Sequence, residues 1–380
     1  MTRSLVGRNL SFRYRGREVL RDVSIEVPRG KVSVVVGPNG SGKTTLLWLL
    51  AGLLEPAGGT VTVEESGGDG DAGGHGGVVQ HPCANPRSSD TAANSAAVAP
   101  PIQASRPRSV RGPLEGLGVV FQDPALWEHL TAEEHLRLVL AGKGLSRPER
   151  QARIAEALGR LRLEDLRGRR PAQMSGGQRQ RLAIARAIAI RPQWLLLDEP
   201  LAHLDGAIRT ELLELLRQTL RQSNAGVLMT THSPEDALRL ADEVLILQGG
   251  RTLQSGPAME VYRRPASLAA ALALGPASQV RGEVRGGNLV SEGAVVIEDL
   301  SPLPAGPTVL LLRPEDVRFH PEASASARVR GCEWSGGRYR LAVQTAAGIV
   351  LAYSDARHSE GAAGRLRFIA SNGAAPAQAS

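Results

Sequence analysis

A glycine-rich segment near the N-terminus has the composition of a phosphate-binding loop. It follows the β-branched run Val32–Val36, precedes a predicted helix over Thr44–Leu54, and consists of Gly37, Pro38, Asn39, Gly40, Ser41, Gly42, Lys43 and Thr44. Glycines let successive backbone N–H groups point at phosphate oxygens, and a helix N-terminus adds partial positive charge. In this pattern the lysine reaches the β- and γ-phosphates, and the threonine hydroxyl ligates Mg²⁺. We therefore predict that this loop and the adjacent Thr45 bind a nucleotide; a chance glycine-rich turn is the alternative.

Two acidic residues follow a second apolar run. The run Trp194–Leu197 is predicted to be a buried strand, and Asp198 and Glu199 come directly after it. At a rigid strand end, Asp198 would bind Mg²⁺ directly or through water, and Glu199 would orient or deprotonate an attacking water. An acidic pair at a strand end is commonly only a turn, but beside a phosphate loop it predicts nucleotide hydrolysis.

A third segment predicts another anion site. Ser175, Gly176, Gly177 and Gln178 open a predicted helix, and the small residues leave its first backbone N–H groups accessible. The alternative is an ordinary N-cap with a flexible turn. One chain does not need two triphosphate sites of this kind, so we interpret this segment as completing a nucleotide pocket on another copy.

With the stretch MSGGQRQRLAIARAIAIRPQWLLLDEP, the sequence resembles the ATPase subunit of ABC transporters. The resemblance implies that Tyr14 stacks on adenine and that Gln122 contacts Mg²⁺ or the lytic water and couples to a membrane partner. It also implies that Asp205, in the loop after the acidic strand, communicates across a dimer, and that His232 contacts the γ-phosphate. The alternatives are a core aromatic for Tyr14 and a structural strand-end histidine for His232.

Three features depart from the family pattern. His203 replaces a residue that is usually small or an amide, and Ser233 replaces an aspartate. A segment over 65–113, rich in Gly, Pro, Ser and Ala, interrupts the chain and is expected to be a disordered insertion. It holds a histidine and cysteine set that could suggest a metal cluster, although such spacing in a Gly-rich segment favours coincidence: His75, His81 and Cys83.

Alternating strands and helices predict an α/β domain over 1–265. Residues 3–64 are predicted as strand, strand, loop, helix and strand, and residues 130–190 as a helical subdomain that includes the Ser-Gly-Gly segment. Later strands alternate with helices, which is typical of a mostly parallel sheet covered on both faces. The resemblance implies a P-loop ATPase fold with a RecA-like core, an antiparallel β lobe and this helical subdomain.

The last hundred residues predict a second domain. Short Val- and Leu-rich runs separated by Gly, Pro and Ser indicate an all-β domain over 277–371, followed by a tail over 372–380. The segment 312–317, Leu-Arg-Pro-Glu-Asp-Val, resembles the C-terminal domain of one ABC importer subgroup. The resemblance implies an OB-like barrel with a role in regulation or dimerisation. Members of that subgroup carry sugars, sulfate, molybdate, polyamines or ferric iron.

Composition excludes some classes of protein. There are 45 Lys+Arg and 38 Asp+Glu, giving a net charge of +7, which suggests nucleic acid. However, acids are interleaved with the arginines over 147–191 and aromatics are nearly absent there, which argues against a single-strand stacking groove.

Two cysteines indicate a reducing compartment. The longest apolar run, Leu46–Leu54, is too short to span a membrane, and we find no signal peptide, so an intracellular protein is expected.

Together these observations predict an ATP-hydrolysing subunit of an ABC importer that uses ATP and Mg²⁺. We expect two copies to sandwich two ATP molecules at the cytoplasmic face of the membrane, in contact with permease subunits and indirectly with an extracytoplasmic substrate-binding protein. No nucleic acid partner is expected. The alternatives are a soluble ABC ATPase acting on ribosomes or DNA, and the ATPase of an exporter. The sequence does not identify the transported solute, and we prefer ferric iron or an oxyanion.

Overall fold

The computed structural model describes residues 2–66, 116–202, 204–301, 303–369 and 377–378 of the chain. The predicted insertion over 65–113 therefore lies outside the described residues except at its first two positions, and so do His203 and most of the predicted tail. None of the helices in the described ranges is long and apolar enough to cross a membrane.

A six-stranded sheet forms the centre of the N-terminal domain. Its first five strands are parallel and the last is antiparallel, in the order β5 (Leu117–Val120), β6 (Trp194–Asp198), β7 (Gly226–Thr231), β3 (Val32–Val36), β8 (Glu243–Gln248) and β9 (Arg251–Pro257). Every residue of β6 and β7 is buried, as expected for strands covered on both faces. Because parallel strands end at one edge, the loops after β3, β5, β6 and β7 meet there.

A smaller antiparallel sheet packs beside this core. Its order is β2 (Arg17–Pro28), β1 (Thr2–Tyr14) and β4 (Gly58–Ser66). The first 66 residues thus hold one strand more than predicted. The reason is a tight hairpin between β1 and β2, in which both Arg15 (φ 48°) and Gly16 (φ 82°) adopt the left-handed conformation.

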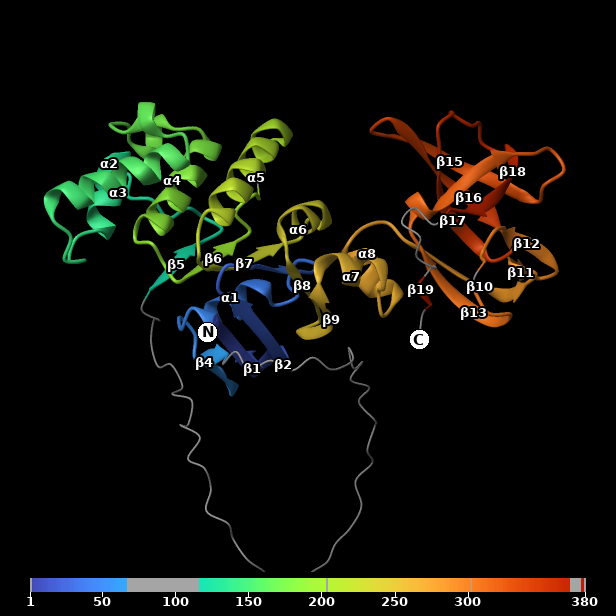
Figure 1. Ribbon diagram of the computed structural model, residues 1–380, viewed down its shortest axis with the longest axis horizontal. Coiled ribbons are helices and arrows are strands. Elements are labelled where there is room, and N and C mark those ends of the chain that lie inside the picture. The colour runs from blue at the N-terminus through green and yellow to red at the C-terminus, as the bar shows by residue number, and fades with distance from the viewer. Residues whose placement is uncertain (1, 67–115, 203, 302, 370–376, 379–380) are drawn as a thin grey trace, which may run out of the picture.

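Helices cover the central sheet and form a separate group on one side of it (Figure 1). This group contains α2 (Ala132–Val139), α3 (Arg147–Arg160) and α4 (Gly176–Ala189), with short 3₁₀ turns η1 (Glu164–Leu166) and η2 (Pro171–Gln173). The remaining helices are α1 (Lys43–Leu50), α5 (Gly206–Arg221), α6 (Pro234–Leu240), α7 (Ala258–Arg263) and α8 (Leu268–Ala273). Helix α1 ends at Leu50, four residues before the predicted end, with Ala51 as its C-cap.

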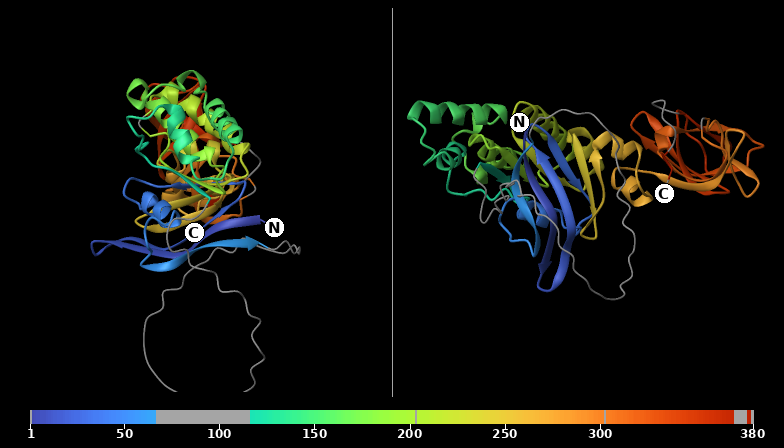
Figure 2. Two further views of the ribbon diagram at one scale, coloured as in Figure 1. Left: turned by 90° about the vertical axis from the view of Figure 1, so that its left-hand side faces the viewer. Right: turned by 60° about the horizontal axis from the view of Figure 1, so that its bottom comes forward.

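The C-terminal domain is all-β, as predicted. A closed barrel has the order β14 (Val317–Pro321), β17 (Gly348–Ser354), β16 (Arg338–Thr345), β15 (Ala327–Ser335) and β18 (Ala363–Phe368). A second sheet has the order β12 (Ala294–Ile297), β11 (Asn288–Ser291), β10 (Ser278–Arg285), β13 (Gly306–Leu312) and β19 (Ala377–Gln378). One apolar core joins them. Figures 1 and 2 show this domain at one end of the molecule, beyond α7 and α8.

One arginine connects the C-terminal domain to the end of the ATPase-like domain. Arg313, which precedes η3 (Pro314–Asp316), is only 5% exposed. Its guanidinium lies 4.1 Å from the ring centroid of Tyr262 and donates hydrogen bonds to backbone carbonyl oxygens, at 2.9–3.2 Å, of Ala271, Gly275, Pro276 and Tyr262. Burial, and then a hydrogen bond to Glu315, raise the pKa of the Tyr262 phenol, which stays protonated and donates to that carboxylate. We call these three residues, Tyr262, Arg313 and Glu315, the joint.

We expect Arg313→Ala to lower the free energy of unfolding by about 2–4 kcal/mol, because it leaves several buried carbonyl groups without a donor. The urea midpoint, followed by circular dichroism, measures the change. Arg281→Ala, at an exposed position of β10, is the matched control and should change the midpoint little. Equal midpoints for the two variants would contradict the importance of the joint.

Candidate active site

The predicted phosphate loop lies between the end of β3 and the start of α1. A Cβ on Gly37 would collide with the carbonyl oxygen of Leu247 and lie 2.7 Å from Ser41 Oγ, so only glycine fits there. Lys43 is 5% exposed, and its ammonium donates to the carbonyl oxygens of Gly37 (3.0 Å) and Pro38 (3.2 Å). Ser41 Oγ is buried without a hydrogen-bond partner in the described part of the chain. A cramped loop with a buried cation and an unpaired hydroxyl fits a phosphate group.

Oxygen ligands suited to Mg²⁺ meet at the end of β6. Thr44 Oγ1 donates to Asp198 Oδ1 (3.1 Å), and Thr230 Oγ1 on β7 donates to the same oxygen (2.7 Å). Burial raises the pKa of Asp198, against which these two hydrogen bonds act. A hydroxyl and a carboxylate side by side match the oxygen donors that Mg²⁺ prefers. These residues therefore fit the metal that the sequence predicts.

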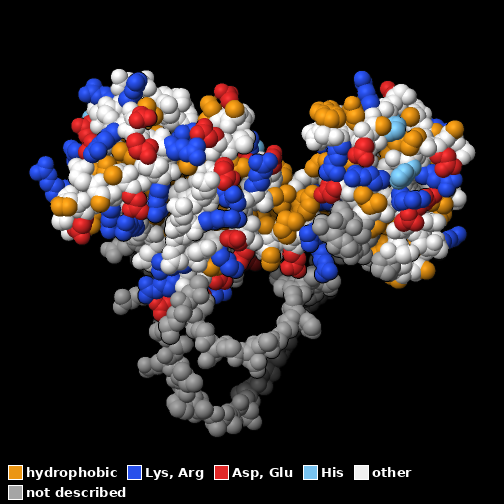
Figure 3. All heavy atoms as spheres, turned by 45° about the horizontal axis from the view of Figure 1, so that its top comes forward, with side chains coloured by type: hydrophobic (Ala, Val, Ile, Leu, Met, Phe, Trp, Pro, Cys, Tyr) orange, Lys and Arg blue, Asp and Glu red, His pale blue; other side chains and the backbone are white. Residues whose placement is uncertain are grey.

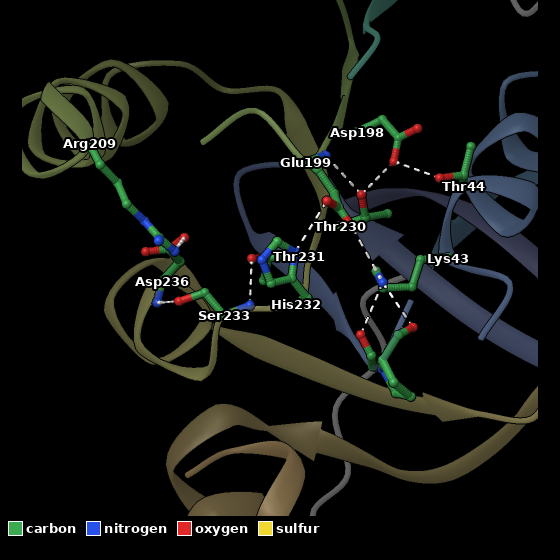
Figure 4. A network of polar contacts seen from close by, with 12 residues as sticks. Lys43, Thr44, Asp198, Glu199, Arg209, Thr230, Thr231, His232, Ser233 and Asp236 are labelled. Carbon is green, nitrogen blue, oxygen red and sulfur yellow. Dashed lines mark hydrogen bonds and ion pairs between the residues drawn. The ribbon is translucent and has the colours of Figure 1, made fainter. Parts of the chain in front are cut away.

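Several neighbouring groups fix the position of Glu199 (Figure 4). Its backbone has a φ of 43°, an uncommon conformation for a residue with a Cβ, and its N–H donates to Thr230 Oγ1 (3.0 Å). Its carboxylate is 12% exposed and lies 3.4 Å from Lys43 Nζ and 3.2 Å from His232 Nδ1. The fold thus places a nearly buried carboxylate between an ammonium group and an imidazole, next to the phosphate loop.

His232 lies at the end of β7, on a pocket of about 260 Å³ that Glu199 and Asn39 also line. The turn after it is fixed by α6, where Ser233 Oγ accepts the N–H of Asp236 (3.3 Å). Ser233 thus serves as the N-cap. Arg209 of α5 donates to the buried Asp236 carboxylate at 2.6 Å (Figure 4).

Sequence reasoning missed Thr230, Arg209 and Asp236. The pair Thr230-Thr231 directly before His232 was the available signal for the first, because strand-end hydroxyls often bind adjacent polar groups. The Arg209–Asp236 pair has no such signal, since the two residues are joined only by the packing of α5 and α6.

Three other predicted residues lie apart from this network. Tyr14 ends β1 and is 60% exposed, so it is not a core aromatic. Gln122 is exposed just after β5, at the same sheet edge as Asp198, because β5 pairs in parallel with β6. Asp205 is exposed directly before α5. Within the described chain, no side-chain hydrogen bond or ion pair joins these three to Glu199.

The Ser-Gly-Gly segment forms the N-terminus of α4. Ser175 Oγ accepts the N–H of Gln178 (3.3 Å), and the Gln178 side chain accepts the N–H of Ser175 (2.9 Å). Ser175 and Gly176 are exposed, whereas a Cβ on Gly177 would lie 2.5 Å from Ile208 of α5. The N-cap hydrogen bond explains why residue 175 is a serine. The close contact with Ile208 explains why residue 177 is a glycine. No hydrogen bond in the described residues links this segment to the phosphate loop.

The chain after Gln122 is fixed by two residues that sequence reasoning also missed. Arg186 of α4 donates to the carbonyl oxygens of Ala125 (2.7 Å) and Pro124 (3.0 Å). His135 of α2 accepts the N–H of Trp127 at Nε2 (2.9 Å), so its proton is on Nδ1, which donates to the carbonyl oxygen of Thr131 (2.8 Å). These bonds fix the segment just after Gln122, residues 124–127, to the helical subdomain.

Stability should depend on pH through His135. Burial lowers its pKa below the 6.5 of a free histidine, so the unfolded chain binds the proton more tightly. The contribution of the neutral imidazole is therefore complete above about pH 6.5 and is lost as the pH falls through the lower folded pKa. Thermal unfolding from pH 8 to 5 should show a smaller decline for His135→Gln than for the wild type. The exposed His129→Gln is the control, and an unchanged profile for His135→Gln would contradict the assignment.

Comparisons with known proteins identify both domains. The ABC transporter family model matches residues 20–202, and the TOBE domain model matches residues 310–372. A sulfate/thiosulfate import ATP-binding protein of Burkholderia mallei is 34% identical over 352 residues, which are 90% of this chain and 89% of that protein. A spermidine/putrescine import ATP-binding protein of Methylococcus capsulatus is 33% identical over 344 residues, 87% of this chain and 78% of the relative.

Two further similarities agree with these matches. An Fe(3+) ions import ATP-binding protein of Pseudomonas fluorescens is 31% identical over 338 residues, 87% of this chain and 84% of that protein. A solved structure of an ATP-binding subunit of an ABC transporter has a TM-score of 0.52 and 28% identity, and it covers 71% of this chain and 98% of its own. The chain therefore belongs to the ABC transporter family, as an importer ATP-binding subunit with a C-terminal TOBE domain, and it hydrolyses ATP.

Proposed function

We propose that the network around Glu199 is the hydrolytic centre and that ATP hydrolysis there drives uptake of a small polar ion. The position of Glu199 between Lys43 and His232 carries this proposal. Lys43, Ser41 and the loop N–H groups hold the β- and γ-phosphates. Thr44 and Asp198 would hold Mg²⁺, which would neutralise charge on the phosphate oxygens. Glu199 accepts a proton from the attacking water, and His232 donates to the γ-phosphate.

The exposed start of α4 supports a composite site. Ser175 and Gly176 present a helix N-terminus to solvent, separate from the phosphate loop of the same chain. We propose that they close on the γ-phosphate held by a second copy, with Tyr14 stacking on adenine and Asp205 at the contact between copies. Gln122, held through its loop by the helical subdomain, transmits the closure to permease subunits.

Mixing two inactive variants tests this arrangement. Lys43→Ala and Ser175→Arg should each abolish ATPase activity alone, because every homodimer site then lacks one half. A mixed dimer contains one site with both defects and one intact site, so co-refolded or co-expressed chains should regain about a quarter of wild-type activity if sites act independently and chains mix at random. Steady-state ATPase assays measure the recovery. No recovery on mixing, with dimers verified by light scattering, would contradict the composite site.

We propose an oxyanion such as sulfate as the solute, with ferric ion as the second candidate. Relatives named for sulfate/thiosulfate import and for Fe(3+) import, each aligned over most of the chain, support this choice. The protein would lie at the cytoplasmic face of the membrane, with permease subunits and, through them, an extracytoplasmic binding protein. Uptake of labelled sulfate, ferric ion and spermidine in cells lacking this chain decides among the three. Loss of spermidine uptake alone would overturn the proposal.

A soluble ATPase acting on nucleic acid is the alternative function. On the face drawn in Figure 3, basic side chains are interspersed with acidic ones over the helical part of the molecule. Interspersed charge gives a weaker electrostatic footprint for a phosphate backbone than a basic stripe does. Co-purification with detergent-solubilised membrane proteins, rather than with nucleic acid, would favour the importer.

A further inference from the structure

A second pocket lies between the helical subdomain and the core. It has a volume of about 340 Å³ and is formed by α3, the ends of α4 and α5, and the residues just before β6 and β7. Its apolar lining includes Ala157, Ile188, Leu195 and Leu220. Because it contacts the amino ends of β6 and β7, it is on the opposite edge of the sheet from the loops that form the ATP site. Its size is in the range of pockets that enclose small molecules.

The charged residues of this pocket are mostly arginines. Four arginines, Arg29, Arg153, Arg160 and Arg191, line it with a single acid, Glu156. Glu156 forms ion pairs of 2.7 Å with both Arg160 and Arg191. The pocket thus carries an excess of guanidinium groups, for which one carboxylate cannot compensate.

The partial negative charge at the C-terminus of a helix explains the position of only some of these arginines. Arg191 follows the C-terminus of α4, where partial negative charge attracts a cation. Arg153, in contrast, lies in the middle of α3, and its side chain has no hydrogen bond or ion pair among the described residues. The carboxylates of Glu149 and Glu156 attract this guanidinium from a distance, but neither forms an ion pair with it, so its donors can bind an external anion.

We propose that this pocket binds a monosubstituted phosphate whose apolar group rests on Leu195 and Leu220. A phosphate dianion accepts bidentate hydrogen bonds from guanidinium groups and compensates more than one of them. Its bound form would touch α3 of the helical subdomain together with β6 and α5 of the core. Such a ligand stabilises the relative position of the two parts in which these contacts form.

Phenyl phosphate is a suitable probe for the full-length protein. Saturating ADP and Mg²⁺ are added first, so that the phosphate loop is occupied, and binding is measured by calorimetry. Inorganic phosphate supplies the charge alone, and benzyl alcohol supplies the ring alone. Phenyl phosphate should bind about tenfold more tightly than either, since it uses both the guanidinium groups and the apolar lining. Equal affinity for all three, or loss of binding when ADP is present, would overturn the proposal.

Two substitutions in the pocket should change the affinity for phenyl phosphate in opposite directions. Arg153→Gln should weaken phenyl phosphate binding about tenfold, because it removes a charge-assisted hydrogen bond. Glu156→Gln should strengthen binding severalfold, because it removes the acid that competes for Arg160 and Arg191. Arg281→Gln, on the exposed face of β10, should leave binding unchanged. Wild-type affinity in Arg153→Gln, with wild-type thermal stability, would show that the pocket is not an anion site.

Discussion

Glu199→Gln should retain ATP binding and lose at least about 100-fold in ATP turnover, the usual range for removal of a general base. The amide keeps the size of the carboxylate but cannot accept a proton. Lys43 would still reach the phosphates, and its two carbonyl contacts in the loop would be unaffected. Steady-state phosphate release measures turnover, and titration with a fluorescent ATP analogue measures affinity.

The control for Glu199→Gln is the same substitution at Glu235. That residue is in the first turn of α6, and its side chain is 71% exposed. Glu235→Gln should keep wild-type turnover. Near-normal hydrolysis by Glu199→Gln would remove Glu199 as the base and direct attention to His232. Equal losses of affinity and turnover would instead indicate a binding role for Glu199.

Lys43→Ala should lower the affinity for ATP about 100-fold, because it removes charge-assisted hydrogen bonds to two phosphates. It should also leave Glu199 in a nearly buried position without its ammonium neighbour. Lys143→Ala, in an exposed turn after α2, changes the same charge at a distant place and should bind ATP normally. Retention of wild-type affinity by Lys43→Ala, in protein with an unchanged circular dichroism spectrum, would exclude this loop as the phosphate site.

Local patterns predicted the parts of the fold that have strong periodic signals. The apolar runs of β3 and β6 are buried as predicted, apart from the half-buried Val32, and the Val- and Leu-rich runs of the C-terminal domain lie in strands, apart from Ile369 just after β18. The β1–β2 hairpin was missed because its turn, Arg15-Gly16, adds only one glycine to a strongly basic stretch. Strands β9, β11 and β14 were missed because none of them contains an unbroken apolar run of more than two residues, and pairing with neighbours defines them.

In the candidate site, too, local patterns predicted some residues, whereas others depend on contacts between distant segments. Motifs predicted Lys43, Thr44, Asp198 and Glu199, which the fold brings together, because phosphate and metal binding require particular residue types. Residues that hold these side chains in place were not predicted. Thr230 acts through one hydroxyl, and His135 acts through backbone groups of a loop that precedes it. Such roles depend on which segments meet in space, and spacing along one sequence does not contain that information.

The joint at Arg313 also bears on how such proteins diversify. Its guanidinium is bound to main-chain carbonyl groups, and among the described residues the side chain that the ATPase domain contributes to these contacts is that of Tyr262. Mutations elsewhere in the short helices α7 and α8 would therefore leave the attachment intact. We therefore expect that a C-terminal domain carrying this arginine would attach to a different ATPase domain that ends in helices of the same shape. Recombination at this boundary would give hybrid subunits that exchange C-terminal domains and keep the ATPase domain unchanged.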